Sequence, residues 1–139
     1  MKLSAEMKKL LLDELRFVVE RMKEAKEPFQ KMYFFSAAYG AVNRIMNIEF
    51  DDELGFIHNV LSSAYSIINL RLSALSSGNE VAVGIPAKMF DRLEAGLEEI
   101  IEMVEEGKAT YPALQKISNA AYSTTGNGYY LYLKGYLVV

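Results

Sequence analysis

The sequence predicts a mainly α-helical fold, an antiparallel bundle of four long helices plus one or two short ones. Apolar residues recur at spacings of three and four over long stretches, and prolines and glycines separate those stretches. The chain has 139 residues, of which 51% are hydrophobic. This length suits one helical-bundle domain, residues 1–139, with a core that needs no disulfide or structural metal.

The first helix is expected to follow Ser4, a residue type that caps helix N-termini, and to run to about Lys26. Pro28 can open the second helix, because proline is tolerated at a first helical position. That helix should reach about Asn47. A short corner between the two would make them antiparallel neighbours.

The second helix lacks charge between Lys31 and Arg44, which indicates burial. Besides its large apolar residues it has a stripe of small and polar ones at helical spacing. Small residues allow backbones to approach closely, so this stripe predicts a helix contact inside the fold or between subunits. The stripe consists of Ser36, Gly40, Asn43 and Asn47.

Asp51 or Asp52 can cap the third helix, which should continue to Ser77 and stop at Gly78. Its polar face carries no lysine or glutamate, although a solvated helix normally does. We therefore expect something other than bulk water to cover that face. Its residues are His58, Ser62, Ser66, Asn69, Ser73 and Ser76.

A fourth helix is expected from about Pro86 to Glu106, and a shorter fifth from about Thr110. The last segment, 129–139, alternates apolar and polar residues. Two interpretations stay open for it: a small β pairing of 80–85 with 129–138, or a last buried helix capped by Asn127.

The composition excludes several classes of function. The chain has no cysteine and one histidine, which rules out cysteine-ligated zinc, iron–sulfur clusters and a thiol nucleophile, and within one chain a two-histidine metal site. A formal charge of −3 without a basic cluster argues against nucleic-acid binding. The longest uncharged windows, 54–70 and 117–133, are interrupted by serine and asparagine, so no membrane span is expected. We expect a cytoplasmic protein without a cofactor, and the excess of glutamate over aspartate is a thermophile-like bias.

The fourth helix has a row of acidic residues, and Glu102 and Glu105 have the spacing of di-metal carboxylates. The row is expected on an outer, solvated face, so no metal site is predicted. His58 could act as a general base if Glu49 or Asp52 oriented it, although a structural role is commoner. The acidic row consists of Asp91, Glu94, Glu98, Glu102 and Glu105.

A loop of hydroxyls and glycines before the last segment could cradle an anion, with Lys134 adding a positive charge. The same residues also suit an ordinary turn. The speculative ligand-binding set is Thr124, Thr125, Gly126, Gly128, Lys134 and His58.

Two functional hypotheses follow. The first is a non-enzymatic homo-oligomeric interaction module held through the second and third helices and the tyrosine-rich C-terminus. The alternative is a binding protein or small enzyme for a phosphate-bearing compound or nucleotide, using the loop from Thr124 to Gly128. The speculative interface set is Ser36, Gly40, Asn43, Ser62, Ser66 and Asn69.

Overall fold

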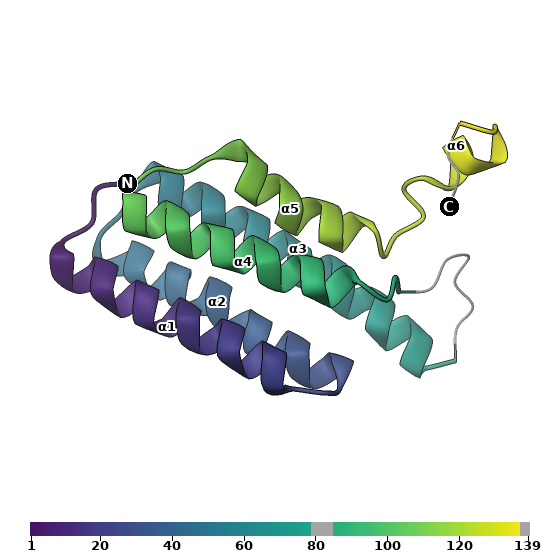
Figure 1. Cartoon of the computed structure of the whole chain (residues 1–139), viewed down its shortest axis with the longest axis horizontal. Helices are drawn as coiled ribbons and strands as arrows, with labels where there is room; N and C mark the ends of the chain where they lie inside the picture. Colours follow the sequence, from purple (N-terminus) through teal and green to yellow (C-terminus); the bar gives the residue numbers. More distant parts are fainter. Residues whose placement is uncertain (79–84, 137–139) are drawn as a thin grey trace.

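A computed structural model describes residues 1–78 and 85–136, which form six helices and no strand (Figure 1). The mainly α-helical bundle predicted from the sequence is therefore confirmed. The helices are α1 (Ala5–Glu24), α2 (Pro28–Ile48), α3 (Asp52–Ser76), α4 (Met89–Glu106), α5 (Tyr111–Tyr122) and α6 (Tyr129–Leu133).

The helices α1 to α5 run alternately up and down around one core (Figure 1). Helix α1 packs against α2 and α4, α3 packs against α2 and α5, and α4 packs against α5. These contacts close a ring in the order α1, α2, α3, α5, α4. Short connections link α1 to α2, α2 to α3 and α4 to α5, which explains why the helices of each of these pairs are antiparallel.

The helix ends follow the local sequence signals. The Ser4 hydroxyl accepts a hydrogen bond from the Met7 amide at 3.2 Å, and the Asp51 carboxylate accepts one from the Leu54 amide at 3.1 Å. Gly107, with a φ of 74°, ends α4 in the left-handed conformation. Helix α4 starts later than expected because Pro86 opens a turn, in which the Met89 amide donates to the Pro86 carbonyl at 3.0 Å.

The core is formed by apolar residues of α1 to α5 that repeat at helical spacing. Burying each large aliphatic or aromatic side chain contributes about 1.5–3 kcal/mol. The largest fully buried side chains are Phe35, Leu11, Leu15, Met22, Met32, Ile45, Leu54, Ile57, Leu61, Ile68, Met89 and Leu93.

The C-terminal segment is helical, as one interpretation of its sequence expected, but it is not buried. Residues Tyr129–Leu133 form the helix α6, so the strand interpretation is wrong there. The Tyr129 amide donates to the Gly126 carbonyl and the Lys134 amide to the Tyr130 carbonyl, which are turn and helix bonds rather than a ladder. Helix α6 is exposed rather than buried. Residues 80–84, expected as the partner strand, and residues 137–139 lie outside the described part of the chain.

Within the described ranges, no helix is both long enough and apolar enough to cross a membrane.

Candidate interaction surface

The exposed sides of α2 and α3 carry no formal charge over most of their length. Helix α2 has none between Lys31 and Arg44, and α3 has none between Glu53 and Arg71 with His58 neutral. Since α2 packs against α3, these sides adjoin. We call their exposed residues the neutral face: Tyr33, Ala37, Gly40 and Asn43 on α2, and Phe56, Asn59, Ser63, Ser66 and Leu70 on α3.

Half-buried aromatic rings join α2 to α3 beside this face. The Tyr39 ring lies 5.3 Å from the Tyr65 ring and 6.2 Å from the His58 ring, measured between centroids. His58 is thus placed as a packing partner of Tyr39. The Glu49 carboxylate, considered as its orienting group, instead accepts a hydrogen bond from the Ser4 amide at 2.8 Å.

The opposite side of the bundle is held by surface ion pairs. Arg16 pairs with Glu105 and Lys23 with Glu98 between α1 and α4. The hydrogen bond to Glu98 raises the pKa of Lys23. Glu102, the other carboxylate of the suggested metal spacing, is exposed. No group of three or more metal-ligating side chains that could hold an ion occurs in the part of the chain that the structure describes.

Glu94 corrects one sequence-based expectation, because it is buried rather than on the outer face of α4. Its carboxylate pairs with the Lys31 ammonium at 3.2 Å, and Lys31 also donates to the Met22 carbonyl at 2.5 Å. This bridge ties the start of α2 to α1 and α4. Helical spacing alone does not predict that Glu94 is buried, because Glu94 lies in the same row as four solvated carboxylates.

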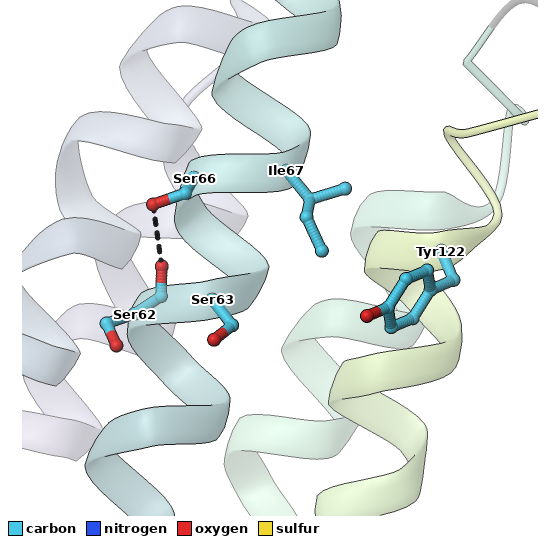
Figure 2. Close-up of a pocket in the computed structure, with 5 residues that line it drawn as sticks. All are labelled: Ser62, Ser63, Ser66, Ile67 and Tyr122. Atoms are coloured by element: carbon cyan, nitrogen blue, oxygen red, sulfur yellow. Dashed lines mark hydrogen bonds between the residues drawn. The ribbon is translucent and has the colours of Figure 1, made fainter.

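A shallow groove of about 350 Å³ lies between α3 and α5 (Figure 2). Its walls are three serines and Ile67 from α3, facing the Tyr122 ring from α5. The Ser66 hydroxyl donates back to the Ser62 carbonyl at 3.1 Å. We call this the serine groove, lined by Ser62, Ser63, Ser66, Ile67 and Tyr122.

The predicted interface residues all lie on α2 and α3. Gly40, Asn43 and Ser66 are exposed, while Ser36, Ser62 and Asn69 are half-buried. A Cβ added at Gly40 would meet no atom within 4 Å, so this glycine is not required for packing within the subunit. The residues that sequence reasoning missed are the aromatic and aliphatic members of the face, Tyr33, Phe56 and Leu70, whose spacing also suits core positions.

The loop predicted to bind an anion forms a run of hydrogen-bonded turns. The Thr124 hydroxyl donates to the Ala121 carbonyl at 2.7 Å, and the Thr125 hydroxyl donates to the Tyr122 carbonyl at 2.8 Å. The amides of both threonines donate to the same two carbonyls, and the Asn127 amide donates to the Thr125 hydroxyl. These donors are therefore used locally.

The remaining members of the predicted ligand set have other surroundings in the part of the chain that the structure describes. The Lys134 ammonium lies over the Tyr130 ring, 5.5 Å from its centroid. His58 contacts Tyr39 between α2 and α3. A Cβ at Gly126 would meet no atom within 4 Å. Phosphate binding by Thr124 to Gly128 stays a prediction.

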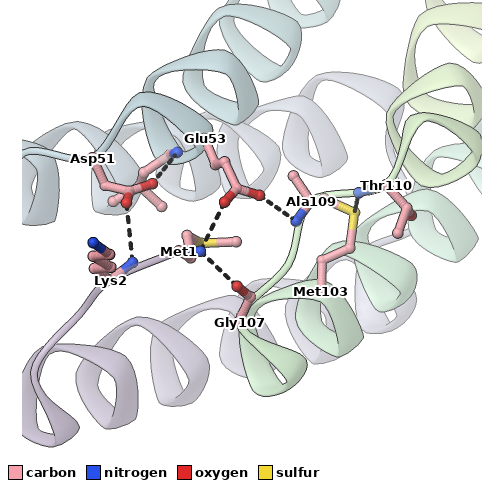
Figure 3. Close-up of polar contacts among 9 residues, drawn as sticks. Met1, Lys2, Asp51, Glu53, Met103, Gly107, Ala109 and Thr110 are labelled. Atoms are coloured by element: carbon pink, nitrogen blue, oxygen red, sulfur yellow. Dashed lines mark hydrogen bonds and ion pairs between the residues drawn. The ribbon is translucent and has the colours of Figure 1, made fainter.

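The N-terminus is fastened to α3 and to the end of α4 by a carboxylate clasp (Figure 3). The Glu53 carboxylate accepts hydrogen bonds from the Met1 ammonium at 2.8 Å and the Ala109 amide at 2.6 Å. These bonds lower the pKa of Glu53. The Met1 ammonium also donates to the Gly107 carbonyl at 2.5 Å. The clasp fixes the end of the bundle opposite α6 (Figure 1).

Two neighbouring carboxylates extend the clasp. Burial raises the pKa of Asp51, but hydrogen bonds from backbone amides, including those of Lys2 and Leu54, together with the Met1 ammonium charge outweigh it, and the net pKa is lowered. Hydrogen bonding from Ser4 likewise lowers the pKa of Glu49. All three carboxylates are thus stabilised in their charged form.

Comparison with protein-family models, with curated proteins and with solved structures finds no match to this chain.

Proposed function

We propose that this protein is a non-enzymatic homo-oligomeric interaction module that assembles through the neutral face. The observation that carries the proposal is the exposure of large apolar side chains on a surface without charge. Tyr33, Phe56 and Leu70 are each more than half exposed, and no formally charged side chain lies among the residues of that face. Such a surface is typical of protein contacts rather than of solvated helices.

The charge distribution favours the neutral face over the charged side of the bundle for contact with a second copy. Each copy has a formal charge of −3, so two copies repel one another at long range. Contact through the ion-paired side of α1 and α4 would also require desolvation of charged groups. Contact through the neutral face avoids that cost, and the same face on each copy can form a two-fold interface.

The small residues support close packing at that interface. Because the space beside Gly40 is open in the subunit, a partner helix can approach its backbone. The half-buried hydroxyls of Ser36 and Ser62 accompany it on α2 and α3. A chain without cysteine fits a reducing compartment, and we therefore place the assembly in the cytoplasm.

The test is a pair of charge insertions that are matched in size and spacing. Ser62→Glu with Ser66→Glu adds two charges to α3 and should convert the assembly to monomers. Gln115→Glu with Asn119→Glu adds the same charges, four residues apart, to the exposed side of α5. That control should retain the wild-type mass in size-exclusion chromatography with light scattering. An unchanged mass for a folded α3 variant would contradict the proposal.

A further inference from the structure

His58, the single histidine of the chain, lies where the α2 and α3 parts of the neutral face meet. It precedes Asn59, an exposed member of the face, and Ser62 follows it one turn later on α3. Its ring lies 6.2 Å from the Tyr39 ring of α2, measured between centroids. His58 is half-buried in the subunit, so part of its surface remains accessible to a second copy.

Protonation of His58 would place a positive charge on a surface that otherwise has none. Histidine is the side chain that ordinarily gains a proton between about pH 8 and pH 5. The other titratable residues in the uncharged stretches of α2 and α3 are Tyr33, Tyr39 and Tyr65. Tyrosine ordinarily loses its proton only near pH 10 and carries no charge below that pH.

The side of α2 that faces His58 offers no negative charge to a protonated imidazole. Tyr39 is the residue of α2 whose ring contacts it, and a tyrosine ring is neutral near pH 7. The two charged residues that bound the uncharged stretch of α2 are cations, and each is paired with a carboxylate of another helix. Lys31 pairs with Glu94 of α4, and Arg44 pairs with Glu14 of α1.

The acidic residues at the start of α3 are mostly engaged in the clasp. Glu53 accepts hydrogen bonds from the Met1 ammonium and the Ala109 amide, and Asp51 accepts them from the Lys2 and Leu54 amides. Asp52 is exposed beside them. Within the described ranges, none of these carboxylates forms an ion pair with His58. In the other direction along α3, the next charged residue is a cation, Arg71.

Helix α5 packs on a different side of α3. Its Tyr122 faces Ile67 across the serine groove. Ile67 and His58 are half a turn out of phase on a helix of about 3.6 residues per turn, so they lie on opposite sides of α3. The titratable and charged residues of α5 therefore do not face His58. These residues are Tyr111, Lys116 and Tyr122.

We infer that His58 makes assembly through the neutral face dependent on pH, so that the assembly forms near pH 8 and weakens as the pH falls toward 5. This inference rests on the proposed function, because it requires an oligomer. In a two-fold interface the second copy contributes the same uncharged face, and hence no carboxylate that could pair with the imidazolium. A charge buried without a partner is strongly unfavourable.

Hydrogen bonding adds to this effect. A neutral imidazole has one donor and one acceptor, and it can bond to serine and asparagine side chains of the kind that the face contains. An imidazolium has two donors and no acceptor. Protonation therefore removes an acceptor from the interface while it adds a charge. The free subunit, in which water reaches His58, binds the proton more readily than the assembled one, and assembly must weaken as the proton binds.

The net charge of the chain acts in the opposite direction but is the smaller effect. Protonation of its one histidine changes the formal charge from −3 to −2, which reduces the repulsion between copies. That repulsion acts between exposed charges, which are largely screened beyond about 8 Å at physiological ionic strength. A charge buried in the interface is screened much less. The local effect of His58 therefore decides the sign.

The subunit should stay folded over the pH range of this test. The three clasp carboxylates have lowered pKa values and remain charged well below neutral pH. Sedimentation velocity over a dilution series, at about pH 8 and about pH 5.5 in the same salt, measures assembly on the two sides of histidine's ordinary titration. Wild-type assembly should be about tenfold weaker or more at the lower pH, and circular dichroism checks the fold at both.

Three variants assign the effect to His58. His58→Gln stays polar but cannot gain a charge, so it should assemble equally at both pH values; His58→Asn is a second neutral variant with the same expectation. His58→Lys should assemble weakly at both. His58→Gln with Asn119→His moves the histidine to an exposed position of α5 and leaves the composition of titratable groups unchanged. This relocation control should assemble as His58→Gln does.

The outcomes separate the inference from the proposed function. A wild-type oligomer that is equally tight, or tighter, at the lower pH would overturn the role of His58 and leave the proposed function in place. A pH dependence that persists in His58→Gln and His58→Asn, or that returns in the relocation control, would also overturn it. A wild-type monomer at both pH values would overturn the inference and the proposed function together.

Discussion

The side chain of Ile117 occupies the space where a Cβ on Gly96 would lie. An ideal Cβ at Gly96 would be 2.5 Å from Cδ1 and 2.9 Å from Cγ1 of Ile117. Ile117 is fully buried, so its side chain has little freedom to move. This contact sets how closely α4 and α5 approach, and so positions the α5 wall of the serine groove.

Gly96→Ala is expected to destabilise the protein by about 1–2 kcal/mol, because overpacking outweighs the gain in helix propensity. Urea unfolding followed by circular dichroism measures the change. Gly55→Ala is the matched control, since its added Cβ would lie at 3.5 Å from the Met46 sulfur, an ordinary contact. That control should gain about 0.5–1 kcal/mol. Equal effects of both substitutions would refute the close approach of α4 and α5.

The Lys31–Glu94 bridge predicts a strongly non-additive pair of substitutions. Glu94→Leu leaves a largely buried ammonium unpaired and should cost about 3 kcal/mol. Lys31→Met with Glu94→Leu removes both charges and should restore most of that stability. Unfolding free energies of the single and double variants form the test. The interpretation would be contradicted if the double variant lost more unfolding free energy than the two single variants lose together.

The clasp predicts acid sensitivity with a defined sign. Glu49, Asp51 and Glu53 have pKa values lowered by folding, so each contributes stability above its usual pKa, and that stability is lost as the pH falls through the lowered value. The loss should begin near pH 4.5, the usual value for glutamate. Urea midpoints measured between neutral pH and pH 3 should fall less steeply for Glu53→Gln than for wild type.

Glu20→Gln is the control for the clasp, since it makes the same change in net charge at an exposed position of α1. It should follow the wild-type pH dependence. If Glu53→Gln does so too, the clasp contributes no acid sensitivity.

Gly40 gives a test of the neutral face that separates folding from assembly. Gly40→Leu should raise the stability of the subunit by about 0.5–1 kcal/mol, because the site is open and leucine is the better helix former. It should weaken assembly at least tenfold by blocking close approach of a partner helix. Asn119→Leu, exposed on α5, should leave assembly unchanged. Sedimentation velocity over a dilution series measures the assembly of both variants. Tighter assembly of Gly40→Leu than of the wild type would exclude a close helix contact at Gly40.

Helix positions were predictable because their signals are local. The Ser4 and Asp51 caps, Pro28 and Gly107 each act within one turn of the chain. The burial of Glu94 depends on Lys31, which is remote in sequence, so helical spacing placed Glu94 on the wrong face. The C-terminal segment was ambiguous because its conformation also depends on contacts with residues that are remote in sequence. Its alternating pattern suits a strand only if a partner strand is present, whereas the carbonyls of Gly126 and Tyr130 accept a turn bond and a helix bond.

The candidate surface was only partly predictable. The absence of charge on α2 and α3 is visible in the sequence, and it indicated the positions of Gly40, Ser62 and Ser66. The sequence does not show which apolar residues leave the core, because Phe56 and Leu70 fit an apolar helical stripe as well as Leu54 or Leu61. The serine groove depends on Tyr122 of the neighbouring helix α5 facing α3, which no local pattern encodes.

Native mass spectrometry of the wild-type protein decides whether the chain assembles with itself. A homo-oligomer has a mass that is an integer multiple of the 15.7 kDa chain, at least two, and here we expect no retained small molecule. A single-chain mass at micromolar concentration would contradict it, and the neutral face would then be a surface that water covers.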